Sequence, residues 1–202
     1  MVPPSPKGSP WPSSKKPENA ALKVKPRTLR LHQAEGLQVR LMNLAEQTFD
    51  QLVRADERLA CAESCTGGLI AARLTDVPGI SAVFIGAVVA YTNGVKRALL
   101  GVETDLLEME GAVSAACASA MAEGVRLRLK SDWGLATTGI AGPDGGTPST
   151  PVGLVYIAVA GPEETRVERN LFVGDRTSIR DQVVNRALEL LLACLTQTQP
   201  SV

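Results

Sequence analysis

The chain has 202 residues, 45% of them hydrophobic and 21% charged, which is enough sequence for one globular domain with a buried core. Aromatic residues make up only 3%, and this argues against a platform that stacks the bases of single-stranded nucleic acid. The net charge is zero and the single histidine, His32, lies in a polar stretch rich in Pro and Lys, which argues against a Ser-His-Asp triad, a Cys-His dyad and a multi-histidine metal site.

Residues 1–36 differ in composition from the rest of the chain. They hold seven of the thirteen prolines, and seven Lys or Arg against two Glu, a charge of +5 that leaves −5 for the remainder. We interpret this stretch as a disordered tail and residues 37–202 as the folded domain. Two roles of this tail stay open. It could bind nucleic acid or membranes weakly, or it could be a solubilising or incidental extension. The acidic body argues against nucleic acid as the main partner.

The first half of the folded domain alternates helical and strand patterns. Leucines at helical spacing from Leu37 predict a helix that ends near Asp56, and a short apolar run predicts a strand over Leu59–Ala62. The next predicted elements are a helix over Gly67–Leu74, a buried strand over Ala82–Tyr91, a helix over Val95–Leu100 and one or two helical turns over Thr104–Glu110.

The second half predicts a helix, three strands and a last helix. Ser114 is a plausible N-cap for a helix that runs to about Lys130. A short strand over Gly134–Thr138 follows, then an antiparallel hairpin of Val152–Ala160 with Thr165–Val173, and finally a helix over Thr177–Leu195. The expected fold is α/β, a three-layer α/β/α sandwich with a mixed, mainly parallel sheet, because continuous apolar strands need cover on both faces.

Cysteine usage and the lack of long apolar stretches indicate the compartment. The four cysteines form no CxxC pair, so we interpret them as small core residues of a reduced, cytoplasmic protein. The segment Met1–Pro12 has no apolar stretch of the kind found in signal peptides. The longest apolar stretch, Ile80–Ala90, is about half of the ~20 residues that a membrane span needs. We therefore expect no membrane association.

Three polar loops follow predicted strands: Glu63–Gly68, Tyr91–Lys96 and Thr138–Gly146. Ligands of such sheets bind at the carboxyl ends of the strands. In the first loop, Ser64 precedes a helix that opens with two glycines, a setting that suits a nucleophile beside free backbone N–H groups. The alternatives are a simple N-cap serine or an anion-binding loop. Cys65 is a rival nucleophile that lacks a histidine base.

A serine without histidine needs another base, and a lysine with a lowered pKa is the common one. Five of the seven lysines lie in the tail, which leaves Lys96 and Lys130 in the folded domain. Lys130 ends a helix and is typical of a solvated cation. Lys96 follows a strand end, and we expect Arg97 and partial burial to lower its pKa. Tyr91 could relay a proton or bind the serine; the alternative is a surface lysine with an edge tyrosine.

The glycines of Thr138–Gly146, near a strand end and an expected helix start, suit a phosphate or a sugar, because their backbone N–H groups can approach an anion closely. The loop is neither a GxGxxG motif nor a Walker A motif. Arg176, at the start of the last helix, could hold a phosphate or a carboxylate. The alternatives are a long Gly/Pro turn and an ordinary surface arginine.

Together these segments resemble the C-terminal domain of the CinA (competence/damage-inducible) proteins, whose stand-alone members are nicotinamide-nucleotide amidases. The resemblance covers about Leu37–Leu195. It rests on five motifs in this order: Ala62–Gly68, Tyr91–Lys96, Gly111–Ser114, Thr138–Gly146 and Gly174–Arg176.

The resemblance implies an α/β/α fold, a homodimer, and hydrolysis of nicotinamide mononucleotide to nicotinic acid mononucleotide and ammonia, within pyridine-nucleotide salvage. It implies Ser64 as nucleophile, Lys96 as its base and Tyr91 in the proton network. No metal and no cofactor are implied. Backbone N–H groups near Thr66–Gly68 are expected to hold the oxyanion. The implied substrate-binding residues are Thr66, Gly67, Gly68, Thr138, Gly139, Gly142, Gly145 and Arg176.

Two rival functions belong to other classes. One is a non-catalytic nucleotide-binding or partner-binding module linked to competence or DNA damage. The other is a nucleic-acid-binding protein led by the basic tail, whose DNA affinity would depend strongly on salt. Full-length CinA proteins carry a larger N-terminal domain, resembling molybdopterin-binding proteins, where this sequence has only the tail, so we expect that domain's activity to be absent.

Overall fold

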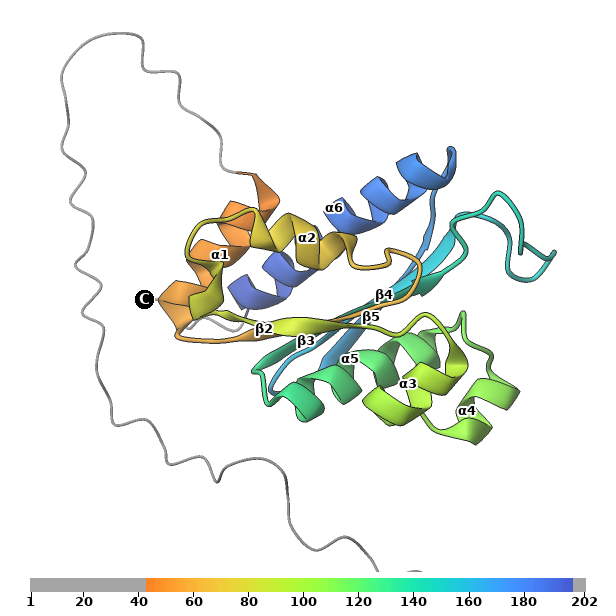
Figure 1. The fold of residues 1–202 in the computed structure, drawn as a ribbon, viewed down its shortest axis with the longest axis horizontal. Coiled ribbons are helices and arrows are strands. Elements are labelled where there is room, and N and C mark those ends of the chain that lie inside the picture. Colours follow the sequence, from red (N-terminus) through yellow and green to blue (C-terminus); the bar gives the residue numbers. More distant parts are fainter. Residues whose placement is uncertain (1–42, 198–202) are drawn as a thin grey trace, which may run out of the picture. The chain divides into compact units, whose positions relative to one another are not determined.

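The computed structural model describes residues 43–197, in which helices and strands alternate along the chain (Figure 1). The helices are α1 (Leu44–Ala55), α2 (Leu69–Thr75), α3 (Asn93–Leu100), α4 (Thr104–Met109), α5 (Ala115–Leu129) and α6 (Arg176–Gln197), with a short 3-10 helix over Ile80–Ala82. The strands are β1 (Leu59–Glu63), β2 (Phe84–Val89), β3 (Trp133–Gly139), β4 (Leu154–Ala160) and β5 (Thr165–Leu171).

The strands form one mixed sheet in the order β2-β1-β3-β4-β5. β1 pairs in parallel with β2 and β3, whereas β4 runs antiparallel to β3 and β5. The predicted hairpin is confirmed, with Ala160 opposite Thr165 beside its turn. Because β1, β2 and β3 run in the same direction, their carboxyl ends meet at one edge of the sheet. The three polar loops begin at this edge.

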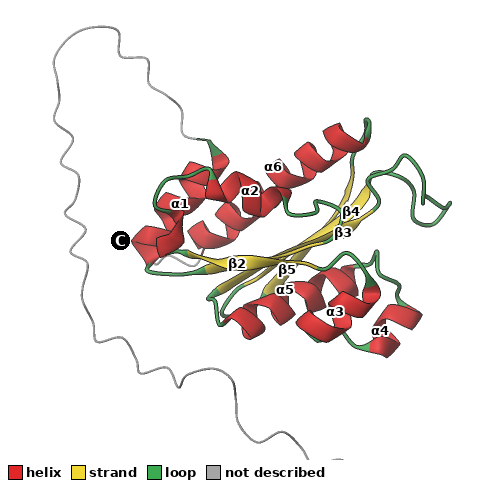
Figure 2. Cartoon of the chain, viewed as in Figure 1, coloured by secondary structure: helices red, strands yellow, loops and turns green. Residues whose placement is uncertain are grey.

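Helices cover both faces of the sheet, and the three-layer sandwich is confirmed (Figure 2). α1, α2 and α6 enclose one core with the sheet, and α3, α4 and α5 enclose the other. Successive residues of β3 enter different cores: Leu135 packs on the α6 side and Ala136 on the α5 side. Both cores are built from small and branched side chains, as the composition predicts.

The strand predicted as buried over Ala82–Tyr91 is instead an edge strand. β2 is shorter than predicted and pairs only with β1. Every second residue faces solvent, and Ile85 and Val89 are 42% and 46% exposed. The burial prediction was wrong because an apolar run does not reveal whether a strand lies at the centre or the edge of a sheet. That depends on the strand order, which is a property of the whole fold.

Side-chain caps fix the two helices that flank the polar loops. Ser114 is the N-cap of α5, as predicted, and its Oγ accepts a hydrogen bond from the Cys117 N–H at 3.1 Å. Thr92 is the N-cap of α3, and its Oγ1 accepts from the Val95 N–H at 3.4 Å. Helix α3 therefore begins directly after β2, which brings Lys96 close to the end of that strand.

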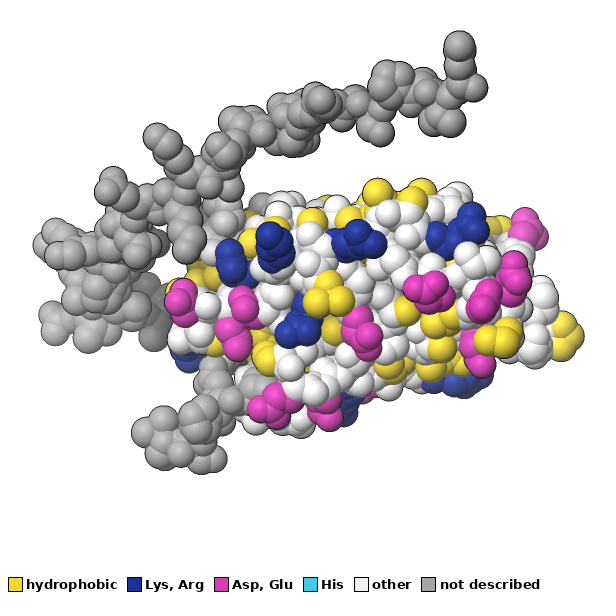
Figure 3. Space-filling model, turned by 90° about the horizontal axis from the view of Figure 1, so that it is seen from below, with side chains coloured by type: hydrophobic (Ala, Val, Ile, Leu, Met, Phe, Trp, Pro, Cys, Tyr) yellow, Lys and Arg dark blue, Asp and Glu magenta, His cyan; other side chains and the backbone are white. Residues whose placement is uncertain are grey.

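All four cysteines are buried and unbridged. Within residues 43–197, no helix combines the length and the apolar character needed to cross a membrane. The face that carries α3, α4 and α5 shows basic and acidic side chains side by side (Figure 3). The predicted tail, residues 1–36, and the start of the first predicted helix lie outside the described residues.

Candidate active site

The loops that follow β1, β2 and β3 meet around a pocket of about 230 Å³. Ser64 and Cys65 come from the first loop and Tyr91 from the second. The third loop contributes lining residues between Gly139 and Gly145, and α6 contributes Arg176. The structure therefore brings together residues that lie more than one hundred positions apart in the sequence.

Lys96 and Ser64 form a hydrogen-bonded pair at this pocket. The Nζ atom of Lys96 lies 3.2 Å from Ser64 Oγ and donates a second hydrogen bond to the Ala90 carbonyl at 2.9 Å. Lys96 is 2% exposed and Ser64 8% exposed. A lysine so close to a serine hydroxyl can accept its proton when the amine is neutral.

Burial lowers the pKa of Lys96 from its usual value of 10.5, because the charged form loses its hydration. The Cys117 and Cys65 thiols oppose this shift. The expected effect of Arg97 is not found, since its guanidinium lies toward the Thr104 hydroxyl, at 3.4 Å. The lowered pKa favours the neutral amine that a general base requires.

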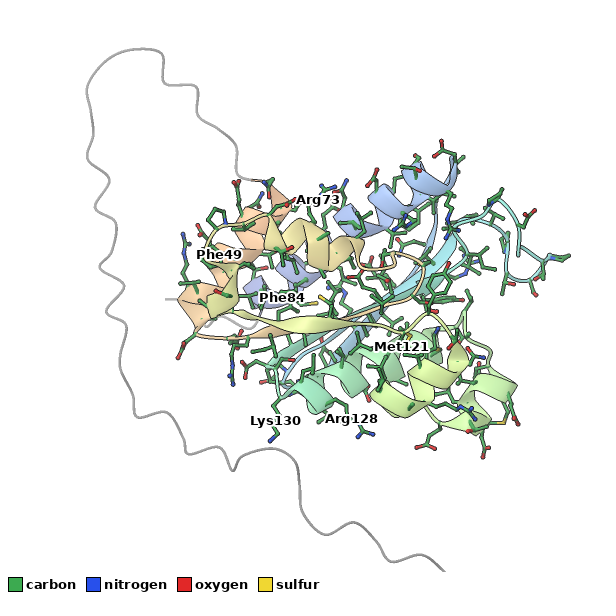
Figure 4. All side chains as sticks on the ribbon, viewed as in Figure 1. Phe49, Arg73, Phe84, Met121, Arg128 and Lys130 are labelled. Carbon is green, nitrogen blue, oxygen red and sulfur yellow. The ribbon has the colours of Figure 1, made fainter. Side chains whose placement is uncertain are left out.

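Lys130 is the only other lysine among the described residues, and it is unsuited to this role. It is the C-cap of α5, in the left-handed conformation, and is exposed. Its side chain points away from the sheet at the end of that helix (Figure 4). The prediction that Lys130 is a solvated cation is confirmed.

Glu63, at the end of β1, fixes the turn that carries Ser64. Its fully buried carboxylate accepts hydrogen bonds from the N–H groups of Gly68, Ile70 and Ala71, at 2.9, 3.1 and 2.9 Å. This carboxylate, rather than Ser64, caps α2. The helix starts at Leu69, two residues later than predicted, because Gly67 and Gly68 adopt positive φ values in the turn.

Two of the amides expected to hold an oxyanion are already engaged. The Gly67 N–H donates to the Ser64 carbonyl at 3.1 Å, and the Gly68 N–H donates to Glu63. Among the described residues, the Thr66 N–H has no oxygen acceptor. It faces the thiol of Cys65, and burial raises the pKa of this thiol to about 11. Cys65 is therefore protonated near neutral pH and is a poor rival to Ser64.

The threonines predicted to bind substrate make internal hydrogen bonds. The hydroxyl groups of Thr66 and Thr137 are 2.8 Å apart in the buried interior. Thr137 also accepts from the Ser64 N–H through its carbonyl, at 3.0 Å. Thr138 Oγ1 donates to the Ala112 carbonyl at 2.6 Å. These contacts connect the nucleophile turn to β3 and to the segment before α5.

Arg176 joins two walls of the pocket. Its guanidinium donates to the Gly142 carbonyl at 2.7 Å and to the Tyr91 hydroxyl at 3.1 Å. Tyr91, 58% exposed, contacts Arg176 rather than Ser64 in this structure. The loop beyond Gly139 leads into β4 and not into the expected helix, so its amides carry no helix-dipole contribution. Gly139, Gly142 and Gly145 all line the pocket.

Sequence reasoning missed several residues of the site. Glu63 and Thr137 fix the nucleophile turn, and Asp144 lines the pocket. Arg180 donates to the Thr66 carbonyl at 2.6 Å from the second turn of α6. The signal for Arg180 was its position four residues after Arg176, on the same face of a helix.

The donor set gives no sign of a metal centre. Within the part of the chain that the structure describes, no group of three or more His, Cys, Asp or Glu side chains could hold a metal ion.

A family model described as the CinA C-terminal domain matches residues 41–195. A CinA-like protein of Gloeobacter violaceus is 55% identical over 150 residues, which are 73% of this chain and 35% of that protein. A CinA-like protein of Synechococcus is 53% identical over 153 residues, 74% of this chain and 36% of that protein. The chain spans about a third of the length of these curated relatives.

Solved structures agree with the sequence comparisons. The competence/damage inducible protein CihA from Agrobacterium tumefaciens is 42% identical with a TM-score of 0.74, covering 76% of this chain and 94% of that chain. A CinA superfamily protein from Klebsiella pneumoniae is 33% identical with a TM-score of 0.73, covering 77% and 99%. The matched fold extends over nearly all of each solved chain.

Proposed function

The chain belongs to the CinA C-terminal domain family, and we propose that it is a serine amidohydrolase that converts nicotinamide mononucleotide to nicotinic acid mononucleotide and ammonia. The observation that carries this proposal is the 3.2 Å contact between the buried amine of Lys96 and the hydroxyl of Ser64. The substrate follows from the resemblance of the five motifs to stand-alone amidases. A pocket lined by Ser64 and Arg176, with Lys96 bonded to Ser64 behind the lining, suits a small amide that bears a phosphate.

In the first half of the proposed reaction, Lys96 takes the Ser64 proton while Oγ attacks the carboxamide carbon. The carbonyl oxygen becomes an oxyanion, for which the Thr66 N–H, which has no oxygen acceptor in the described residues, is the proposed donor. The intermediate collapses with cleavage of the C–N bond. The leaving nitrogen takes the proton from the Lys96 ammonium and departs as ammonia, which leaves an ester on Ser64.

In the second half, Lys96 takes a proton from water, whose oxygen attacks the ester carbon. The C–O bond to Ser64 breaks, Oγ takes the proton back from Lys96, and the acid product leaves. Lys96 thus acts as base and as acid in both halves. Its hydrogen bond to the Ala90 carbonyl keeps Nζ in place through the cycle.

The test is ammonia release from nicotinamide mononucleotide by the wild type and by Lys96→Met and Ser64→Ala. Methionine is one heavy atom shorter than lysine and keeps most of its packing, but it has no base. We expect kcat to fall at least ~100-fold in Lys96→Met, the low end for loss of a general base, with nucleotide binding retained. The acidic limb of the wild-type pH–rate profile reports the Lys96 pKa, and it disappears in this variant.

Lys130→Met is the matched control, because it removes the other lysine of the described residues at an exposed helix end. It should turn over like the wild type. Normal turnover by both Lys96→Met and Ser64→Ala would contradict the Ser-Lys mechanism. A wild type that binds the nucleotide but releases no ammonia would instead favour the non-catalytic nucleotide-binding module.

A further inference from the structure

The pocket contains one carboxylate that the proposed mechanism does not use. Of the residues that line it, only Asp144 and Arg176 carry a charge, one of each sign. Within residues 43–197, the Asp144 carboxylate makes no hydrogen bond and no ion pair, and it is not paired with Arg176. Its charge is therefore available to a ligand in the pocket.

The loop that carries Asp144 is fixed at its base. Gly142 and Gly145, on either side of Asp144, both have positive φ values, which turn the chain sharply around it. Arg176 donates to the Gly142 carbonyl at 2.7 Å and so ties this turn to α6. Asp144 and Arg176 are consequently held in the wall of one pocket, with Ser64 in the same lining.

A pocket with one negative and one positive side chain suits a ligand that carries both charges. We infer that Asp144 recognises the positive ring nitrogen of the substrate, so that the site selects a cationic pyridinium carboxamide with an anionic group over a neutral aromatic amide. This inference rests on the proposed function and deepens it. The Coulomb attraction between the carboxylate and the positive ring needs no directed hydrogen bond. It can therefore act from an exposed loop residue.

The test compares nicotinamide mononucleotide with benzamide riboside 5′-phosphate, a neutral isostere in which carbon replaces the charged ring nitrogen. Binding to the full chain is measured by calorimetry and hydrolysis by ammonia release. Because Asp144 is exposed, we expect the wild type to prefer the cationic ligand about two- to fivefold, the effect of an exposed charge pair. Asp144→Asn should abolish this preference by weakening only the cationic ligand.

Asp105→Asn is the matched control, since Asp105 is an exposed carboxylate in α4 outside the pocket. It should keep the wild-type preference, which separates a local effect from a change in net charge. Equal losses for both ligands in Asp144→Asn, or no loss for either, would overturn the inference. If the wild type binds the two ligands with the expected preference but hydrolyses neither, the amidase reaction is contradicted, and charge selection by Asp144 is then a property of a binding site only.

Discussion

The side chain of Lys96 is almost completely buried, and burial lowers its pKa below the usual value of 10.5. An unfolded chain has no such burial, so its lysine titrates at the usual value. Between the folded-state pKa and 10.5, the unfolded state binds a proton that the folded state does not. The free energy of unfolding therefore rises with pH across this window, and Lys96 adds no pH dependence below the folded-state pKa or above 10.5.

This linkage can be measured against Lys96→Met, which has no such group. Urea denaturation at a series of pH values should show that the stability of the wild type relative to the variant increases with pH up to about 10.5. The buried thiols of Cys61 and Cys65, whose pKa values are raised by burial, act in the opposite direction in both proteins and largely cancel. A difference that does not change with pH would contradict the buried neutral amine.

The guanidinium of Arg176 is proposed to bind the substrate phosphate through its remaining N–H groups while it keeps its contact with Gly142. Arg176→Ala should lower kcat/KM for nicotinamide mononucleotide by roughly 10–100-fold, the effect of losing a charged hydrogen bond of about 1.5–3 kcal/mol. Nicotinamide riboside, which has no phosphate, should be affected much less. The measurement is the ratio of kcat/KM for the two substrates.

Arg128→Ala is the comparison variant for this test, since Arg128 is exposed on α5 and outside the pocket (Figure 4). It should leave the ratio unchanged. An equal loss on nucleotide and riboside in Arg176→Ala would mean that Arg176 only holds Tyr91 and Gly142 in place.

At the scale of elements, the start of α2 depends on a carboxylate from β1. Glu63→Gln keeps the shape of the side chain, but its amide nitrogen cannot accept from the backbone N–H groups that the second oxygen serves. We expect a loss of about 1–3 kcal/mol in the free energy of unfolding, the cost of a buried donor left unpaired. Turnover should fall as well, because Ser64 follows Glu63 directly.

Urea denaturation of Glu63→Gln beside Glu163→Gln tests this role, because Glu163 lies exposed in the β4–β5 turn. Only the first variant should lose stability. Equal stability of the two variants would show that the cap does not hold the nucleophile turn.

Elements that bury a regular stripe were predictable from the sequence. Helix α5 and the β4–β5 hairpin were placed to within about two residues, because periodicity and turn residues are local signals. The edge position of β2 and the partners of the Glu63 carboxylate were not predictable, since both depend on which segments lie side by side. The near-complete burial of the Lys96 side chain was not predictable either, for the same reason.

The site was predictable only in part. Ser64, Lys96, Tyr91 and Arg176 were chosen from loop positions, from the lysine distribution and from the family resemblance, and the structure brings them to one edge of the sheet. Asp144 and Arg180 were missed because a charged residue in a polar loop or helix resembles an ordinary solvated one. Burial or an unused charge distinguishes them, and both are properties of the folded chain.

At the scale of the whole described molecule, Arg180 connects α6 to the nucleophile turn. Its guanidinium donates to the Thr66 carbonyl across 114 sequence positions, while its Nε atom is buried without a partner. Arg180→Met removes the hydrogen bond and also relieves the buried unpaired donor. We therefore expect little change in the thermal unfolding midpoint, but a fall of about tenfold in kcat with KM nearly unchanged, because the turn loses its alignment.

Arg180→Lys, which keeps the charge, should recover part of this loss. A raised KM with normal kcat would assign Arg180 to substrate binding instead. If the thermal unfolding midpoint and kcat of Arg180→Met both fell, Arg180 would have only a structural role.

The contacts that complete the pocket span long stretches of sequence. Ser64 and Lys96 are separated by 32 positions, Tyr91 and Arg176 by 85, and Thr66 and Arg180 by 114. Contacts between residues so far apart in the sequence form late in folding, because closing a long loop loses entropy before the contact stabilises the chain. On the ribosome, the serine and its lysine emerge long before α6 exists. The nascent chain can therefore carry both reactive groups while it still lacks the wall that would hold a substrate, and this delays its chemistry until synthesis has passed α6.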